Sequence, residues 1–555
     1  MSEHLANSSG QLRSEYETIV VGSGYGGAIT AARLAESGRP VCILERGREW
    51  IPGDFPDTGE KLAGAVRRKG NPLGLFDYYL CKDIDVLKGS GLGGSSLVNA
   101  NVALRPDPEA FADPRWPKLY RDLAASGELW AYYQRAEQML HVGPHPKALE
   151  LTKVQMIQKA TAKLTDYKFG PLNIAVNFDV DGPNHVGVQQ KKCINCGDCI
   201  TGCNVTAKNT LYMNYLPYAR QKGAEIFTQI EVRKIAARPG GGYTITYRHN
   251  QADKTGEERT LGAKQVVLSA GTLGSTEILL RSVAAGLAVS GRLGEGFSGN
   301  GDFLALAYNG AYRTNVLGYG NHPESERAQV QPGPTIVSAI QYDRGKPLDQ
   351  RITLQDFTTF PSGLVDTFRY ALPPLALTTG KGTHWGHVVA HAERVGRDLV
   401  GWNPEGAANH SMVYLVMAID HGAGRMTLGG DDKLQITWPD LLKDPIFDKV
   451  KAALLAHAQT LDATYVHLGR FNPWTLRNNL VTAHPLGGCH LAESADRGVV
   501  DVDGTVFDGK GGVHAGLHVV DGAIIPMALA VNPFITISAF AERIAERLAA
   551  APGGG

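Results

Sequence analysis

The sequence has no excess of charge of either sign, because lysine and arginine together number 55 and aspartate and glutamate also number 55. Nucleic acids and anionic membranes are held by basic surfaces, so we expect neither as a partner; a small neutral or apolar substrate fits better. No run approaches the ~18 apolar residues that a membrane-spanning helix needs. Residues 1–15 are polar and lack a secretory signal pattern, so we expect a cytoplasmic protein without a membrane span.

Cysteine is also scarce, with seven residues in a chain of 555, and four of the seven lie between Cys193 and Cys203. A secreted disulfide framework would spread its cysteines along the chain, so this clustering excludes one. The length and the 43% hydrophobic content are too large for one core and predict two well-packed domains.

A glycine-rich turn follows the first apolar run. Thr18 to Val21 is β-branched and apolar, and residues 28–36 have helical spacing, which predicts strand, turn and helix. Gly22 permits the tight turn, Gly24 lets the backbone approach a pyrophosphate, and Gly27 lets the helix pack on the sheet. The N–H groups at the start of the helix are donors for phosphate.

An acidic residue stands where an adenosine ribose would need one. The run Pro40 to Leu44 predicts a second strand, and Glu45 follows it, 23 residues after Gly22. A carboxylate at this distance accepts both ribose hydroxyls and disfavours a 2′-phosphate. Dinucleotide binding follows, with FAD and NAD still open.

Further glycine-rich motifs lie downstream. Residues 89–101 are dense in glycine and serine, which lets backbone lie against a flat ligand. The chain then carries, in order, Val266–Ser275, Leu293–Asp302, the His484-Pro-Leu-Gly-Gly-Cys489 turn, Val520-Asp521-Gly522, and Val531-Asn532-Pro533-Phe534. With these motifs the chain resembles the glucose-methanol-choline (GMC) family of FAD-dependent oxidoreductases, and within it the cholesterol-oxidase-like members.

The resemblance implies FAD as the cofactor and assigns residues to it. The adenosine and pyrophosphate half would be held by Gly22, Gly24, Gly27, Glu45, Val232, Ala270 and Gly271, and the isoalloxazine and ribityl by Gly91, Gly94, Ser95, Asn99, Asp521 and Gly522.

Oxidation of an alcohol by FAD needs an acceptor for the hydroxyl proton and a group that orients the oxygen, while the carbinol hydride goes to flavin N5. The resemblance implies His484 and Asn532 at the reactive edge of the flavin. A neutral imidazole can accept the proton, and the Asn532 amide can donate to the oxygen. We also expect Asn532 to cap a helix that starts at Pro533 and runs to Leu548, with its N-terminus stabilising the reduced flavin.

Cys193, Cys196, Cys199 and Cys203 have the spacing C-x2-C-x2-C-x3-C of the ferredoxin run, apart from its final proline. Three interpretations remain: an iron–sulfur cluster such as [4Fe–4S], a zinc ion, or no metal, with thiols or a local disulfide bracing a loop. A cluster would favour a dehydrogenase that passes electrons to a protein or quinone carrier. Without one, O2 could be the acceptor.

One position departs from the family pattern. Cholesterol oxidases that also shift the double bond use a glutamate upstream of a strand that matches Met412 to Ala418, and this chain has Asn409 and His410 there. Steroid isomerisation is therefore not expected.

The fold class is α/β (α+β overall): a Rossmann-like FAD-binding domain of the GMC type, interleaved with a substrate domain of sheet and helices. We expect residues 14–110, 190–302 and 480–550 to form the first and residues 111–189 and 303–479 the second, with flexible termini at 1–13 and 551–555. The apolar run Leu364 to Leu377 would line a pocket or fill the core.

The leading function is oxidation of a hydrophobic alcohol, such as a sterol, a steroid or another bulky alcohol, to the carbonyl. Alternatives are a sugar or polyol dehydrogenase that uses an iron–sulfur cluster, a non-oxidative flavin lyase or decarboxylase on the same fold, and an electron-transfer protein in which the flavin is a relay.

Overall fold

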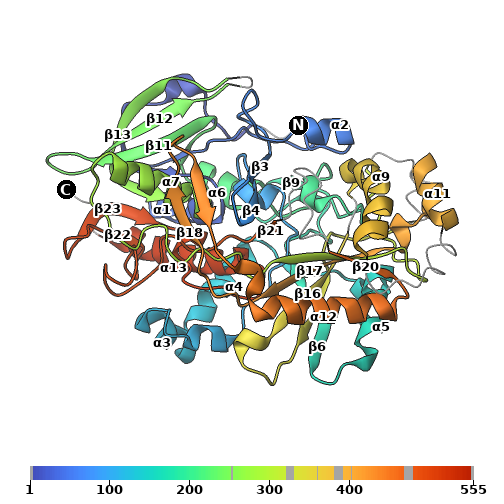
Figure 1. Cartoon of the computed structure of the whole chain (residues 1–555). Coiled ribbons are helices and arrows are strands. Elements are labelled where there is room, and N and C mark those ends of the chain that lie inside the picture. Colours follow the sequence, from blue (N-terminus) through green and yellow to red (C-terminus); the bar gives the residue numbers. More distant parts are fainter. Residues whose placement is uncertain are drawn as a thin grey trace.

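The computed structural model describes residues 4–251, 254–320, 330–358, 361–380, 392–401, 403–467 and 479–551. Two large sheets lie side by side, with helices packed on them (Figure 1). The α/β class expected from the sequence is confirmed.

The first sheet has the strand order β10-β2-β1-β13-β12-β11, and β23 and β22 extend it from β13. Its strands are β1 (Glu15–Val21), β2 (Val41–Leu44), β10 (Glu225–Phe227), β11 (Ile230–Ala237), β12 (Tyr243–His249), β13 (Glu258–Leu268), β22 (Thr505–Phe507) and β23 (Val513–Val519). The strands β10, β2, β1, β13 and β23 pair in parallel. The fingerprint strand β1 is buried from Thr18 to Val21 and lies at the centre, as its continuous apolar run predicts.

The parallel pairing brings distant segments to one edge of this sheet. Val21 lies opposite both Leu44 and Leu268, and Leu268 lies opposite Val519. The segments that leave these strands therefore start side by side, although β1, β13 and β23 are hundreds of residues apart in the chain. Ligands of open parallel sheets bind outside such carboxyl ends.

Helices cover the first sheet. Helices α1 (Tyr25–Glu36) and α7 (Gly271–Ala284) pack on its strands, α1 lies between α13 (Phe534–Ala550) and α6 (Tyr215–Gln221), and α4 (Leu129–Met139) packs on α13. The buried Glu542 carboxylate of α13 accepts hydrogen bonds from Arg33 of α1 (2.7 and 2.9 Å) and from the Tyr215 hydroxyl of α6 (2.5 Å). This buried ion pair joins helices from both ends of the chain.

The second sheet is antiparallel and has the order β20-β14-β17-β16-β15-β6. Its strands are β6 (Tyr167–Pro171), β14 (Phe303–Tyr308), β15 (Ser338–Tyr342), β16 (Ile352–Phe357), β17 (Met412–Ala418) and β20 (Thr464–His467). Helix α12 (Pro445–Thr460) packs on β14, β17 and β20. The other described helices are α2 (Gly59–Gly64), α3 (Lys118–Ser126), α5 (Thr152–Ala160), α9 (Ser362–Thr379) and α11 (Ala392–Val400).

Smaller strands complete the described fold. They are β3 (Phe76–Tyr79), β4 (Ile84–Gly89) and β21 (Leu480–Thr482) in one sheet, and the pairs β5 (Gly143–Pro144) with β7 (Asn173–Ile174), β8 (Gly182–Pro183) with β9 (Gln189–Gln190), and β18 (Arg425–Leu428) with β19 (Leu434–Thr437). In the described ranges no helix is long and apolar enough to cross a membrane.

The strands of each large sheet come from the ranges expected for one domain, which is consistent with the proposed interleaved division; its boundaries stay a prediction. At the N-terminus, the Leu5 N–H donates to the Glu49 carboxylate, and the Asn7 N–H donates to the Ile226 carbonyl. The flexibility expected of the termini stays a prediction, and residues 1–3 and 552–555 lie outside the described part.

The two ends of the chain meet at Gly26, in the first turn of α1. A Cβ atom at Gly26 would lie 1.6 Å from the Val520 carbonyl oxygen, which follows β23. Only glycine lets the helix approach this strand end so closely. The contact was not predicted from the sequence, where Gly27 alone was expected to serve helix packing.

We expect Gly26→Ala to lower the free energy of unfolding by about 1–3 kcal/mol or more, because the new methyl group overlaps a backbone oxygen that cannot move alone. Urea unfolding followed by circular dichroism measures this. In the matched control Gly396→Ala, on exposed α11, the Cβ meets no atom within 4 Å and stability should hold or rise by about 0.5–1 kcal/mol. Equal stability of the two variants would contradict the contact.

Candidate active site

A cavity of about 460 Å³ runs from the carboxyl edge of the first sheet to the face of the second. One end is lined by the turn at residues 21–26 and the other by strands β14, β16 and β17. The cavity therefore joins the dinucleotide fingerprint to the region expected to bind substrate.

Most residues that the sequence assigns to the cofactor line this cavity: Gly22, Gly24, Glu45, Gly94, Ser95, Asn99, Val232, Ala270, Gly271, Asp521 and Gly522. Two do not. A Cβ at Gly27 would lie 2.0 Å from the Gly22 carbonyl oxygen, and one at Gly91 would lie 2.6 Å from the Trp50 ring. Gly27 and Gly91 therefore allow close packing behind the cavity wall instead of facing a ligand.

Two features of the lining fit a dinucleotide. A Cβ at Gly24 would meet no atom within 4 Å, so the space above this backbone is open, beside the N-terminus of α1. Asn101 lines the cavity and is 1% exposed, yet neither its amide nitrogen nor its amide oxygen has a partner among the described residues. Such a buried amide is costly unless a ligand satisfies it.

The two acidic residues expected near the cofactor are already held by the protein. The Glu45 carboxylate accepts from the Ser23 N–H (3.1 Å), the Ser23 hydroxyl (2.6 Å) and the Gly47 N–H (2.8 Å). Burial raises the pKa of Asp521 to about 6, although its carboxyl accepts from Ser275 and from two backbone N–H groups. Asp521 therefore fixes the turn that presents Gly522, and Glu45 fixes the fingerprint turn.

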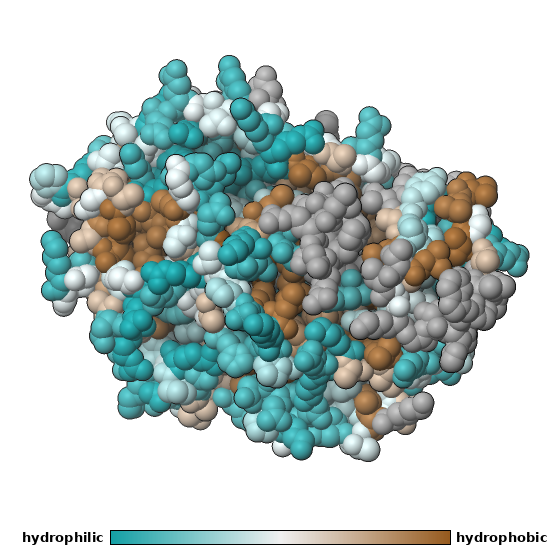
Figure 2. Space-filling view, viewed as in Figure 1, coloured by the Kyte–Doolittle hydropathy of each residue, from teal (hydrophilic) through white to brown (hydrophobic). Residues whose placement is uncertain are grey.

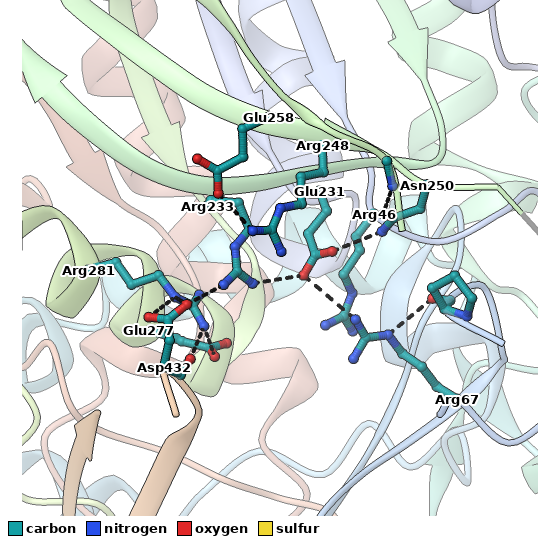
Figure 3. Close-up of polar contacts among 12 residues, drawn as sticks. Arg46, Arg67, Glu231, Arg233, Arg248, Asn250, Glu258, Glu277, Arg281 and Asp432 are labelled. Carbon is teal, nitrogen blue, oxygen red and sulfur yellow. Dashed lines mark hydrogen bonds and ion pairs between the residues drawn. The ribbon is translucent and has the colours of Figure 1, made fainter. Parts of the chain in front are cut away.

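The end of the cavity beside Val232 is lined by charged side chains (Figure 3). Glu231 lies between Arg67 (3.6 Å) and Arg233 (3.3 Å) and accepts from Asn250 (2.9 Å). Burial alone would raise the pKa of Glu231, but Arg46 and Arg67 hold it at about 2. These charged side chains are paired within the protein, so they hold one another in place along the wall.

His484 is oriented by a carboxylate. Its Nδ1 lies 2.8 Å from Asp302 Oδ1, and the second oxygen of Asp302 accepts from the Thr482 hydroxyl (2.8 Å) and the Ala483 N–H (2.9 Å). Because a carboxylate only accepts, the imidazole carries its proton on Nδ1 and leaves Nε2 as an acceptor. The sequence contained Asp302 only as the last residue of a motif, without a role.

Asn532 faces His484 across the cavity wall. Its amide nitrogen lies 3.3 Å from His484 Nε2, and its amide oxygen accepts from Gln355 Nε2 (2.7 Å). The expected helix cap is wrong: α13 starts at Phe534, Pro533 is the cap residue, and Asn532 makes no cap bond. Its amide instead contacts the side chains of His484 and Gln355. Gln355, within strand β16, gave no signal in the sequence.

The wall opposite the fingerprint is apolar. Leu304, Phe357, Val413 and Leu415 of the second sheet line it. Helix α9 adds Leu364 and Phe368, so the apolar run expected to line a pocket does so at these positions.

Farther along, α9 and the neighbouring α11 expose apolar side chains. Leu377 is 60% exposed and Val400 is 90% exposed, and apolar side chains gather over these helices on the right of Figure 2.

Asn409 and His410, where relatives that shift a double bond are expected to place a glutamate, do not line the cavity. His410 Nδ1 lies 2.8 Å from the Gly406 carbonyl oxygen, and Asn409 donates to the Pro404 carbonyl. Burial lowers the pKa of His410. Both side chains therefore brace a loop.

The four clustered cysteines surround a second, small cavity. None of them forms a disulfide. In the described ranges no group of three or more His, Cys, Asp and Glu side chains is placed to hold a metal ion. The buried Lys208 ammonium joins this loop to the cofactor loop, because it donates to the carbonyls of Cys199 (2.9 Å), Leu97 (3.0 Å) and Asn99 (2.7 Å).

Comparison with known proteins gives the family. Models of the GMC oxidoreductase family match residues 16–298 (N-terminal model) and 420–541 (C-terminal model). A cholesterol oxidase of Acinetobacter baumannii is 28% identical, with 95% of this chain and 93% of the relative covered. A cholesterol oxidase of Mycobacterium tuberculosis is 28% identical (96% and 91%), and the long-chain-alcohol oxidase FAO4B of Arabidopsis thaliana is 22% identical (98% and 69%).

Among solved structures, pyridoxine 4-oxidase from Mesorbium loti superposes with a TM-score of 0.59 at 16% identity, covering 96% of this chain and 98% of that one. This likeness supports the fold alone. With the family models spanning both ends of the chain and the dinucleotide cavity between them, the chain belongs to the GMC oxidoreductase family and is an FAD-dependent alcohol oxidoreductase.

Proposed function

We propose that the enzyme oxidises the CH–OH group of a bulky apolar alcohol to the carbonyl, with His484 as the base and Asn532 as the group that orients the substrate oxygen. The observation that carries the proposal is the 3.3 Å contact between His484 Nε2 and the Asn532 amide nitrogen at the cavity wall. An alcohol oxygen placed beside both atoms would replace this contact, donating its proton to Nε2 and accepting from the amide.

The residues that line the cavity fit FAD, with its adenosine half at Glu45 and Val232 and its ring beside Gly94, Asn99 and Asn101. When bound there, FAD supplies the acceptor for the carbinol hydride. The protein's own side chains accept the hydroxyl proton. His484 takes the hydroxyl proton at Nε2, and Asp302 stabilises the imidazolium through Nδ1–H, as carboxylates do for catalytic histidines.

The substrate class follows from the wall that faces His484. The side chains contributed by β14, β16, β17 and α9 are apolar, and the charged residues lie at the other end. An apolar wall excludes water and favours hydrophobic substrates. The names of the relatives, cholesterol oxidase and long-chain-alcohol oxidase, support the same class and support O2 as the electron acceptor. The proposal does not include isomerisation, because neither Asn409 nor His410 is a carboxylate and neither lines the cavity.

His484→Ala should lower kcat by about 10²–10⁴-fold, because the proton then has no positioned acceptor. The measurement is bleaching of the flavin under anaerobic conditions with sterols, long-chain alcohols and sugars, followed by oxygen uptake with the best substrate. His421→Gln, at an exposed site, is the control and should match wild type. If His484→Ala bleaches as fast as wild type, or if no alcohol bleaches the wild type, the proposal fails.

Asp302→Asn should lower kcat by about 10²–10⁴-fold with little change in KM, because the amide cannot stabilise the imidazolium as a carboxylate does. The FAD content should stay that of wild type, which separates this effect from unfolding. Equal falls in kcat and in bound FAD would show that Asp302 acts only through the fold.

Gly24→Ala should leave the unfolding midpoint of the apoprotein unchanged, since the Cβ meets no protein atom within 4 Å, and should weaken FAD binding. The methyl group would stand where the backbone must approach the pyrophosphate. Absorbance of the bound flavin after gel filtration, with titration of the apoprotein by FAD, measures this. Wild-type affinity in Gly24→Ala would place the pyrophosphate elsewhere.

A further inference from the structure

The proposed oxidation makes no use of the loop that carries Cys193, Cys196, Cys199 and Cys203. All four line one small cavity, together with Asp198, Lys208 and Pro334 among others. None of the four is oxidised, so the loop is not held by a disulfide.

The shape of this loop is fixed by its surroundings. Gly197 and Gly202 have left-handed φ angles of 83° and 104°. A Cβ at Gly197 would lie 2.8 Å from Thr358, and one at Gly202 would lie 2.0 Å from the Phe55 ring. The backbone is therefore held in a conformation that turns around the cavity before anything binds there.

A backbone N–H group is aimed at a sulfur atom of the loop. The Asn195 N–H donates to Cys193 Sγ at 3.4 Å. A thiol is a weak acceptor and a thiolate a strong one, so this donor suits a deprotonated ligand. Hydrogen bonds to sulfur are a feature by which proteins tune iron–sulfur clusters.

A buried cation lies beside the same cavity. Lys208 is 2% exposed, its three hydrogen bonds go to carbonyl oxygens, and in the described part of the chain it forms no ion pair with a carboxylate. It lines the same small cavity as Cys199 and Cys203. An isolated buried ammonium is costly, and anionic sulfur at these positions would balance it.

We propose that Cys193, Cys196, Cys199 and Cys203 bind a [4Fe–4S] cluster. Each thiolate of such a cluster binds a different iron, so the four sulfurs stand apart around the core.

The cluster would lie next to the cofactor. The short 3₁₀ turn Cys199–Thr201 separates the two cavities: Cys199 faces the small one, and Ile200 and Thr201 line the large one. This inference concerns binding and does not depend on the alcohol that the enzyme oxidises.

The test is iron and acid-labile sulfide analysis of full-length protein, purified anaerobically and reconstituted with ferrous iron and sulfide. We expect about four of each per chain, with a broad absorbance shoulder beyond the flavin bands and an electron paramagnetic resonance signal after dithionite reduction. Cys196→Ser should lose the metal and the signal while it retains FAD. Cys42→Ala, buried on β2 away from this loop, is the control and should keep both.

The proposal is overturned if the reconstituted wild type, with full FAD, holds no iron and sulfide, or if it holds one zinc per chain. Peptide mapping that finds two of the four cysteines in a disulfide in freshly purified protein would overturn it as well. Because the wild type alone answers these questions, failure of Cys196→Ser to fold would not obscure them. Failure of alcohol oxidation with the cluster present would leave this inference standing.

Discussion

The close approach of Gly26 to the Val520 carbonyl is the contact from which the rest of the site follows. It seats the first turn of α1 on the end of β23, and so it joins the two ends of the chain at the carboxyl edge of the first sheet. The chain leaving β23 then pairs with the loop that follows His484, since the Gly487 N–H donates to the Gly522 carbonyl and the Cys489 N–H donates to the Ala523 carbonyl. The position of His484 therefore depends on packing that begins in the N-terminal fingerprint.

The contact between His484 and Asn532 also depends on the second sheet. Asp302, which holds His484, directly precedes β14, and Gln355, which holds the Asn532 amide, lies on β16. A chain of hydrogen bonds thus runs from one sheet through both catalytic candidates and back to that sheet. Asp302 orients His484 and Gln355 orients Asn532, and each partner belongs to another element. A shift between the sheets would therefore break the contact between His484 and Asn532. A preorganised site of this kind stabilises charge without reorganisation.

The sequence alone predicts the features that depend only on residues close together in the chain. Strand, turn and helix at Gly22 follow from composition over twenty residues, and the acid at the end of β2 follows from spacing. It was insufficient where a side chain had two possible partners. Asn532 before a proline has the pattern of a helix cap, yet tertiary hydrogen bonds take its amide. Gln355 could not be found at all, because β16 also carries Thr353 and Asp356, and nothing in its sequence singles out the side chain that reaches across the cavity.

Lys208 shows how the cysteine loop and the cofactor loop are coupled. Burial lowers the pKa of this lysine to about 8. While charged, it draws the Leu97 and Asn99 carbonyls toward the Cys199 carbonyl, and Asn99 in turn donates to the Tyr25 hydroxyl beside the fingerprint. Loss of the ammonium charge would weaken all three bonds together. The electrostatic state of the cysteine loop therefore bears on the geometry of the cofactor cavity, even though no cysteine of that loop lines it.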